Sequence, residues 1–207
     1  MRRPTLPAAL FVLSALLTVS VVARAQTDVG LSLYGAFSQK TDGNGVAQTP
    51  ANSAGGLIEL RHISNPLVGY EATYSYNRAN ESYSSSVRCP VGTTPCNPTF
   101  EHVSANAHEA SADWIASVHI ANLRPFALAG VGVLFNVPVG GQSSTRTVTK
   151  PVFVYGAGLD WSLVAHLGLR FQYRGNLYKA PDLTRLFTST DAFTHTAEPM
   201  IGAYLRF

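Results

Sequence analysis

Apolar and polar residues alternate with a period of two along most of the chain after residue 26. The clearest stretch is Leu167–Tyr178, where large apolar residues on one face alternate with Gly, Arg, Gln and Asn on the other. Successive side chains of a β-strand point to opposite faces, so this period predicts strands. No convincing period of 3.6 residues, which would indicate an amphipathic helix, occurs after Asp28.

Eight segments follow this rule, most of them about 9 to 15 residues long. Two irregularities stand out. The apolar residues change phase within residues 102–120, which predicts a β-bulge near His108 or Glu109. Pro199 has no amide donor, so we expect it near a strand end or a bulge. The segments are Val29–Phe37, Gly55–Ile63, Val68–Asn77, 102–120, 124–137, Phe153–Leu163, Leu167–Tyr178 and His195–Phe207.

The connections between these segments alternate in length. Short turns near Asn65-Pro66, Asn122–Pro125 and Ala165-His166 follow the even strands, whereas long polar connections follow the odd strands. Short turns at one end and long loops at the other are typical of a barrel that crosses an outer membrane. The sequence therefore predicts an all-β fold, an eight-stranded antiparallel up-and-down transmembrane β-barrel. The long connections lie at about Gln39–Ala54, Ala79–Glu101, Pro138–Lys150 and Lys179–Thr194, and within them Thr41–Ser53 and Ser82–Ser86 read as solvated surface loops.

Alternation alone does not decide whether the apolar face points to lipid or to a dry interior, so a soluble lipocalin-like barrel is a competing reading. The strand charges favour lipid outside, because they collect on the opposite face. An Arg facing hydrocarbon would cost roughly 2 to 4 kcal/mol, whereas charges enclosed in a lumen can pair. We expect a lumen network of Glu59, Arg61, Glu71, Glu109, Asp113, Asp160, Arg170, Arg174, Glu198 and Arg206, and interfacial aromatic girdles that include Tyr70, Tyr74, Tyr76, Trp114, Tyr155, Trp161 and Tyr173.

The first 25 residues read as a cleaved secretory signal peptide, which leaves residues 26–207 as one barrel domain. Arg2 and Arg3 precede an uncharged stretch rich in Ala, Leu and Val, and Ala23-Arg24-Ala25 supplies small residues before Gln26. The alternative is an uncleaved membrane anchor, since about 20 uncharged residues can span a bilayer. Pro4 and Pro7 interrupt the start of that stretch, which favours the signal peptide.

Composition agrees with a membrane barrel and weakens a nucleic-acid reading. Only 13% of the 207 residues are charged, against roughly 25% in typical globular domains. Low charge with 17 Gly, 10 Phe and 9 Tyr excludes disorder and a coiled coil. Three of the 15 Lys and Arg residues precede Gln26, where no acid occurs, so the remainder balances its 12 Asp and Glu residues. We therefore expect no nucleic-acid partner.

Cys89 and Cys96 bracket a short turn-forming segment in a chain that we expect to be exported. A local disulfide that closes this loop is the favoured reading. A zinc site would need three or four ligands, and only His102 is close in sequence. We expect no metal and no other cofactor.

The C-terminal segment His195–Phe207 resembles the signal by which the barrel assembly machinery recognises bacterial outer-membrane proteins. Its candidate signal residues are Tyr204, Leu205 and Phe207. The stretch 124–132, Arg-Pro-Phe-Ala-Leu-Ala-Gly-Val-Gly, is similar to a strand of the OmpA-like small barrels. The resemblance implies contact with outer-membrane lipids, periplasmic chaperones and the assembly machinery. OmpA continues into a peptidoglycan-binding domain, whereas this sequence stops at the last strand, so tethering to the cell wall is not implied.

Three functions fit such a barrel. We expect a monomer with a structural or adhesive role, which displays long loops to an extracellular ligand. The alternative is a narrow porin-like channel for small solutes or ions. A lipid A-modifying enzyme would need a nucleophile, a base and an orienting acid, for which Thr196, His195 and Glu198 are candidates. The alternation places His195 on the lipid face and Glu198 in the lumen, so we expect no catalytic site.

Overall fold

The computed structural model describes residues 26–65, 67–85, 100–140, 144–187 and 189–207, which form ten strands. No helix in this described part is long and apolar enough to cross a membrane. In chain order the strands are β1 (Gln26–Ser38), β2 (Thr41–Gly43), β3 (Val46–Pro50), β4 (Ser53–Ile63), β5 (Val68–Ser85), β6 (Phe100–Ser117), β7 (Leu123–Pro138), β8 (Val148–Val164), β9 (Leu167–Lys179) and β10 (Phe193–Arg206).

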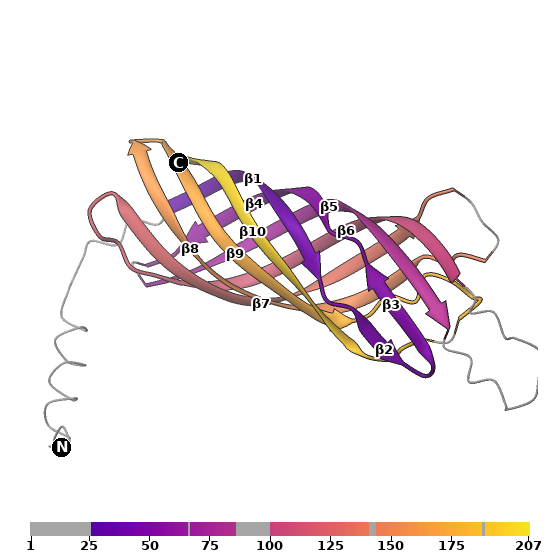
Figure 1. Cartoon of the computed structure of the whole chain (residues 1–207). Coiled ribbons are helices and arrows are strands. Elements are labelled where there is room, and N and C mark those ends of the chain that lie inside the picture. Colours follow the sequence, from indigo (N-terminus) through magenta and orange to yellow (C-terminus); the bar gives the residue numbers. More distant parts are fainter. Residues whose placement is uncertain (1–25, 66, 86–99, 141–143, 188) are drawn as a thin grey trace, which may run out of the picture.

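Eight of these strands close into an antiparallel barrel, which confirms the predicted fold (Figure 1). Each of β4 to β10 pairs with its neighbour along the chain. Strand β1 pairs with both β4 and β10, and the pairing of β5 with β6 completes the ring. The two remaining strands, β2 and β3, form a hairpin within the first long connection, and β3 adds to the outer end of β5.

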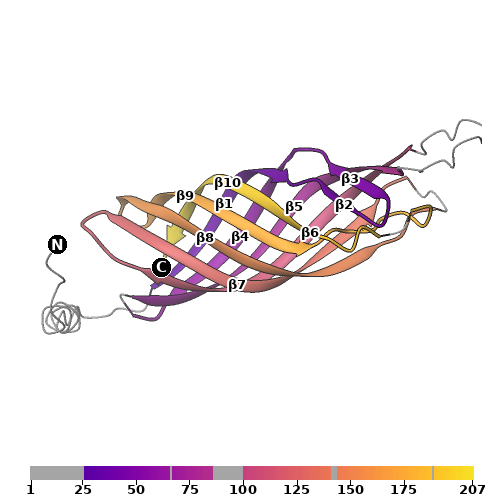
Figure 2. The ribbon, with the colours of Figure 1, turned by 60° about the horizontal axis from the view of Figure 1, so that its bottom comes forward.

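The two ends of the barrel differ as the connection lengths predict. The short turns after β4, β6 and β8 lie at one end, together with the start of β1 and the end of β10 (Figure 2). The backbone amide of Phe207 donates to the carbonyl of Thr27 there, at 2.9 Å. Small outer-membrane barrels have short periplasmic turns and longer extracellular loops, so we refer to this end as periplasmic and to the opposite end as extracellular.

Outward-facing side chains form an apolar band around the barrel. On β5 this band runs from Val68 to Tyr76, after which the outward positions become polar, beginning with Arg78. Strands β5 and β6 have 18 residues each, and at about 3.3 Å per residue and a tilt near 40° they reach roughly 45 Å along the barrel axis. An apolar band is only about 25 Å tall. The barrel therefore extends beyond the membrane on its extracellular side, as its elongated shape suggests (Figure 1).

The predicted β-bulge near His108 is wrong. Strand β6 keeps one continuous register with β5 from Phe100 to Ala116, and its burial alternates without interruption. The apolar residues change phase because the interior changes in character. At the extracellular end the inward positions are apolar, with Val103 and Ala105 buried, whereas Glu109 points into the lumen further down the strand.

Several boundary predictions are also wrong. Pro199 lies within β10, opposite Tyr173 of β9. On the other side of β10, the pairing with β1 is interrupted between Tyr34–Met200 and Phe37–Ala197, because Pro199 has no amide to donate. The supposed surface loop Thr41–Ser53 contains the β2–β3 hairpin, with Val46 and Gln48 buried. Ser82–Ser85 extends β5 rather than forming a loop, and Leu123–Pro125 begins β7 rather than ending a turn.

Candidate functional site in the barrel interior

The periplasmic half of the lumen holds an ion-pair network centred on Asp160 of β8. Its carboxylate accepts hydrogen bonds from three guanidinium groups: Arg170 Nε at 2.6 Å, Arg124 Nη2 at 2.8 Å and Arg61 Nη1 at 3.3 Å. Arg61 also pairs with Glu71 at 2.7 Å, and Arg170 pairs with Glu59. Strand alternation directs all these side chains inward, and pairing offsets much of the cost of removing them from water.

Further contacts tie this network to the barrel wall. Asp28 of β1 accepts from Arg124 Nη2 at 2.5 Å. The guanidinium of Arg61 lies 4.1 Å above the ring of Phe126, and that of Arg170 lies 5.1 Å from the ring of Tyr204. The network contains four acids and four bases, so its charges balance: Asp28, Glu59, Glu71 and Asp160 against Arg61, Arg124, Arg170 and Arg206.

A second group surrounds Arg174 at mid-height in the lumen. Its Nη2 donates to Glu109 Oε1 and to Ser111 Oγ, both at 2.8 Å, and its Nη1 donates to Thr73 Oγ1 at 3.0 Å. Asn176 donates to the other oxygen of Glu109 at 3.0 Å. This fully buried guanidinium therefore links strands β5, β6 and β9 across the interior.

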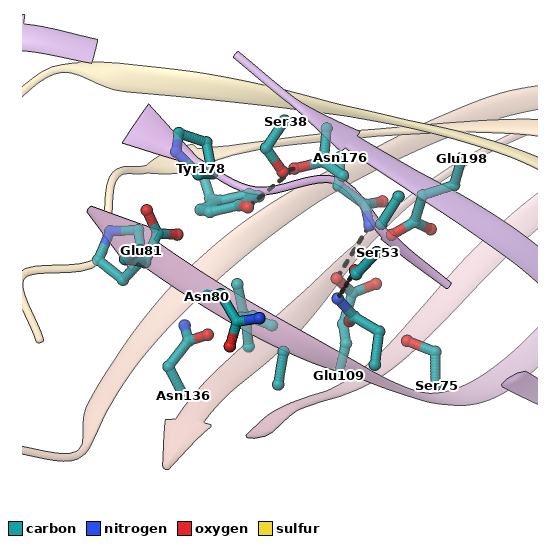
Figure 3. A pocket seen from close by; sticks show the side chains of 18 of the residues that line it. Ser38, Ser53, Ser75, Asn80, Glu81, Glu109, Asn136, Asn176, Tyr178 and Glu198 are labelled. Atoms are coloured by element: carbon teal, nitrogen blue, oxygen red, sulfur yellow. Dashed lines mark hydrogen bonds between the residues drawn. The ribbon is translucent and has the colours of Figure 1, made fainter. Parts of the chain in front are cut away.

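Above Arg174 lies a small polar cavity of about 30 Å³, room for about two waters (Figure 3). Glu81 and Tyr178 line one side of it, and Glu109, Asn176 and Glu198 line the other. Glu198 Oε2 is buried without a hydrogen-bond partner among the described residues, a position that suits an internal water. Among all the residues that the structure describes, no three His, Cys, Asp or Glu side chains are arranged to hold a metal ion.

The connection after β9 closes the extracellular mouth of the barrel. Its residues Ala180–Leu183 turn inward, and the carbonyl of Pro181 accepts hydrogen bonds from Gln48 Nε2 at 2.9 Å and from the Tyr83 hydroxyl at 2.8 Å. The Leu183 amide donates to the same hydroxyl at 3.1 Å. We call the described residues 180–187 and 189–192 the plug. Its Leu183 and Phe187 pack in a cluster with Val46, Tyr83, Val103 and Ala105.

Polar contacts fix the plug from another side. Arg146, in the connection before β8, pairs with Asp182, and its Nε donates to the Asp182 carbonyl at 2.9 Å. Glu101 accepts from Ser144 and from Thr184, both at 3.1 Å. The plug is therefore held by β3, β5, β6 and the connection before β8. The sequence predicts a long polar connection at Lys179–Thr194, and the apolar Leu183 and Phe187 within it are a local signal for the plug.

Of the ten residues proposed for the lumen network, nine are buried in the interior, and Arg206 lies at the periplasmic rim with its side chain 20% exposed. The structure places six of them in the Asp160 group and Glu109, Asp113 and Arg174 in the Arg174 group, whereas Glu198 lines the cavity above Arg174. Sequence reasoning missed Asp28 and Arg124, both of which bind in the first group. Strand parity could have found them, because Asp28 alternates with Val29 and Arg124 shares the inward face of Phe126.

The enzyme residues do not come together. Glu198 points into the lumen, whereas His195 lies on the outer face, where its Nε2 is 2.8 Å from the Tyr155 hydroxyl. Of the three predicted assembly-signal residues, Tyr204 is buried with its ring over Arg170, whereas Leu205 and Phe207 point outward. Cys89 and Cys96 lie outside the described residues.

A closed eight-stranded barrel with an apolar outer band and a charged interior defines an outer-membrane β-barrel protein. Residues 9–198 match the outer membrane protein beta-barrel domain, and the chain belongs to that family. No curated protein matches the sequence.

Solved structures share the fold at low sequence identity. OprG from Pseudomonas aeruginosa is 10% identical with a TM-score of 0.62, over 89% of this chain and 97% of its own. Neisserial surface protein A is 14% identical with a TM-score of 0.55, over 87% and 97%. Ail, the attachment invasion locus protein of Yersinia pestis, solved in complex with the heparin analogue sucrose octasulfate, is 14% identical with a TM-score of 0.53, over 89% and 99%.

Proposed function

We propose that this protein is a closed-lumen outer-membrane barrel whose extracellular end serves as a binding surface. The observation that carries the proposal is the double obstruction of the lumen. The Asp160 and Arg174 groups fill its lower and middle parts, and the plug occupies its mouth. An eight-stranded barrel has an interior just wide enough for its own side chains, which supports the same conclusion.

The extracellular end offers a surface suited to anionic ligands. Arg185 is exposed there, and the side chains of Lys40 and Arg146 remain 53% and 45% exposed although they pair with Asp42 and Asp182. The Ail complex with a heparin analogue supports a sulfated polysaccharide as the first ligand to test. Exposed cations attract such polyanions through space, and added salt screens the attraction.

Binding of the purified, refolded chain to immobilised heparin tests this role. We expect retention at low salt and release as sodium chloride rises, with weaker retention for the Lys40→Gln, Arg185→Gln double variant. Asp42→Asn is the matched control, because it changes an exposed charge at the same end in the opposite sense. Equal retention of the wild type and the double variant would refute a binding role for these cations.

A narrow channel is the second candidate, and the polar cavity above Arg174 is the observation that favours it. Recording from planar bilayers separates the two functions. We expect no stable unit conductance from the closed barrel. A reproducible unit conductance that changes in Arg174→Gln would establish the channel instead.

Export and assembly complete the proposal. We propose cleavage of residues 1–25, insertion by the barrel assembly machinery through the C-terminal strand, and a monomer in the membrane. N-terminal sequencing of protein recovered from outer membranes tests the cleavage, and Gln26 is the expected first residue.

A further inference from the structure

A cluster of polar side chains lies on the outer face of β5 and β6, at the upper edge of the apolar band. Tyr76 donates its hydroxyl hydrogen to Asn106 Oδ1 at 3.1 Å, and Arg78 Nη1 donates to the same oxygen at 2.7 Å. His108 contacts both nearby tyrosines: its Nδ1 is 2.7 Å from the Tyr74 hydroxyl, and its ring centroid is 5.1 Å from that of Tyr76. We call Tyr74, Tyr76, Arg78, Asn106 and His108 the outer-rim cluster.

The cluster carries positive charge without a compensating acid. Among the described residues, no carboxylate lies within ion-pair distance of Arg78 or His108. Four of the five acids of the two strands, Glu71, Glu81, Glu109 and Asp113, are buried inside the barrel. The fifth, the partly buried Glu101, accepts hydrogen bonds from Ser144 and Thr184. The lumen cations instead have acidic partners, as Arg61 has in Glu71. Arg78 therefore differs from them in facing outward with only a neutral amide as its described partner.

The height of the cluster matches a lipid headgroup. Tyr74 and Tyr76 are half-exposed at the upper edge of the apolar band, where tyrosine rings mark the interface between hydrocarbon and headgroups. The next outward position on β5 is Arg78, so its guanidinium lies at the level of the outer-leaflet headgroups. Opposite Tyr76 on β4 stands Gly56, whose lack of a side chain leaves the outer surface there uncovered.

We propose that the outer-rim cluster binds a phosphate group, supplied by the headgroup of an outer-leaflet lipid. A guanidinium presents a planar set of N–H donors that matches phosphate oxygens, and such charge-assisted hydrogen bonds are about twice as strong as neutral ones. Asn106 holds Arg78 in place. When His108 Nδ1 accepts from the Tyr74 hydroxyl, the ring carries its hydrogen on Nε2, which is a second nitrogen donor. This site is separate from the extracellular surface assigned to polyanion binding.

Lipid binding to the folded chain in neutral detergent tests the site. Diphosphoryl lipid A and the same lipid after enzymatic dephosphorylation are the two probes, and inorganic phosphate is the soluble competitor. We expect the phosphorylated lipid to bind at least about tenfold more tightly than the dephosphorylated one, and Arg78→Gln to lose about tenfold in affinity for the phosphorylated lipid alone. Arg78→Lys, which keeps the charge but not the planar donors, should fall between the two.

Lys179→Gln provides the control, because Lys179 is also an exposed cation at the outer end of its strand but already pairs with Asp191. Its affinity should stay within twofold of the wild type. Equal affinity of the wild type and Arg78→Gln for the phosphorylated lipid would overturn the proposal. Inorganic phosphate that binds as tightly as the lipid would overturn the assignment to a headgroup. Heat-resistant mobility of each variant on unboiled gels verifies folding, and should Arg78→Gln not fold, Arg78→Lys and Asn106→Ala carry the same comparison.

Discussion

Replacing Asp160 by asparagine removes the charge at the centre of the periplasmic network while keeping nearly the same shape. Five hydrogen bonds from three guanidinium groups converge on this carboxylate: two from Arg124, two from Arg170 and one from Arg61. Without its charge, the four bases of the network would face three acids in a buried region. Breaking a buried ion pair typically costs 3 to 5 kcal/mol. An asparagine can still accept through Oδ1, so we expect a loss of about 3 kcal/mol in the free energy of unfolding.

Urea titration of the chain refolded into lipid vesicles measures this loss. The outward-facing Trp114 and Trp161 leave the bilayer on unfolding, so their fluorescence reports the transition. The dependence of the free energy on urea concentration should stay unchanged, because the variant exposes no additional surface when it unfolds.

Two comparisons make the test specific. Arg124→Gln in the Asp160→Asn background restores three acids against three bases, and should recover about 0.5 to 3 kcal/mol relative to the sum of the single variants. Asp42→Asn breaks an exposed ion pair with Lys40 and should cost less than about 1 kcal/mol. A loss for Asp160→Asn no larger than that of Asp42→Asn would refute the view that this carboxylate holds the network.

Other predictions follow from single features of the structure. Leu183→Ala removes a fully buried side chain from the plug and should speed proteolysis within residues 180–192. The barrel itself should keep its heat-resistant gel mobility. An unchanged rate of cleavage would contradict the inward packing of this segment. Gly168→Val should prevent folding in vesicles, because a side chain there would overlap the ring of Tyr204, and a normally folded variant would exclude that contact. The Lys179 ammonium donates to Asp191 at 2.6 Å and lowers the pKa of this carboxyl. The ion pair is therefore complete above the ordinary carboxyl pKa and is lost as the pH falls through the lowered pKa. Lys179→Gln should raise the pKa of Asp191 in a carboxyl NMR titration. Deletion of Phe207 should reduce insertion in cells but not refolding into vesicles, and equal insertion of both forms would remove Phe207 from the assembly signal.

The sequence by itself determined the architecture and the parity of the strands. A period of two is a local property of an extended chain, and the bilayer requires that the outward parity be apolar. Glu59, Arg61 and Arg170 could therefore be assigned to the interior from their alternation alone. The alternating lengths of the connections likewise showed which end carries the long loops.

Only the tertiary structure decided which groups meet inside. Arg61 and Asp160 are 99 residues apart, and Arg124 and Asp28 are 96 apart. Their contacts depend on the stagger of strands around the closed barrel and on the reach of each side chain, which no local pattern encodes. The plug is hidden from sequence for the same reason, because Leu183 becomes a buried residue only once Tyr83 and Val103 surround it. The apparent bulge in β6 likewise resolved into a change of interior, since the inward side chains of β6 pack against apolar plug residues at its extracellular end and carry charge further down.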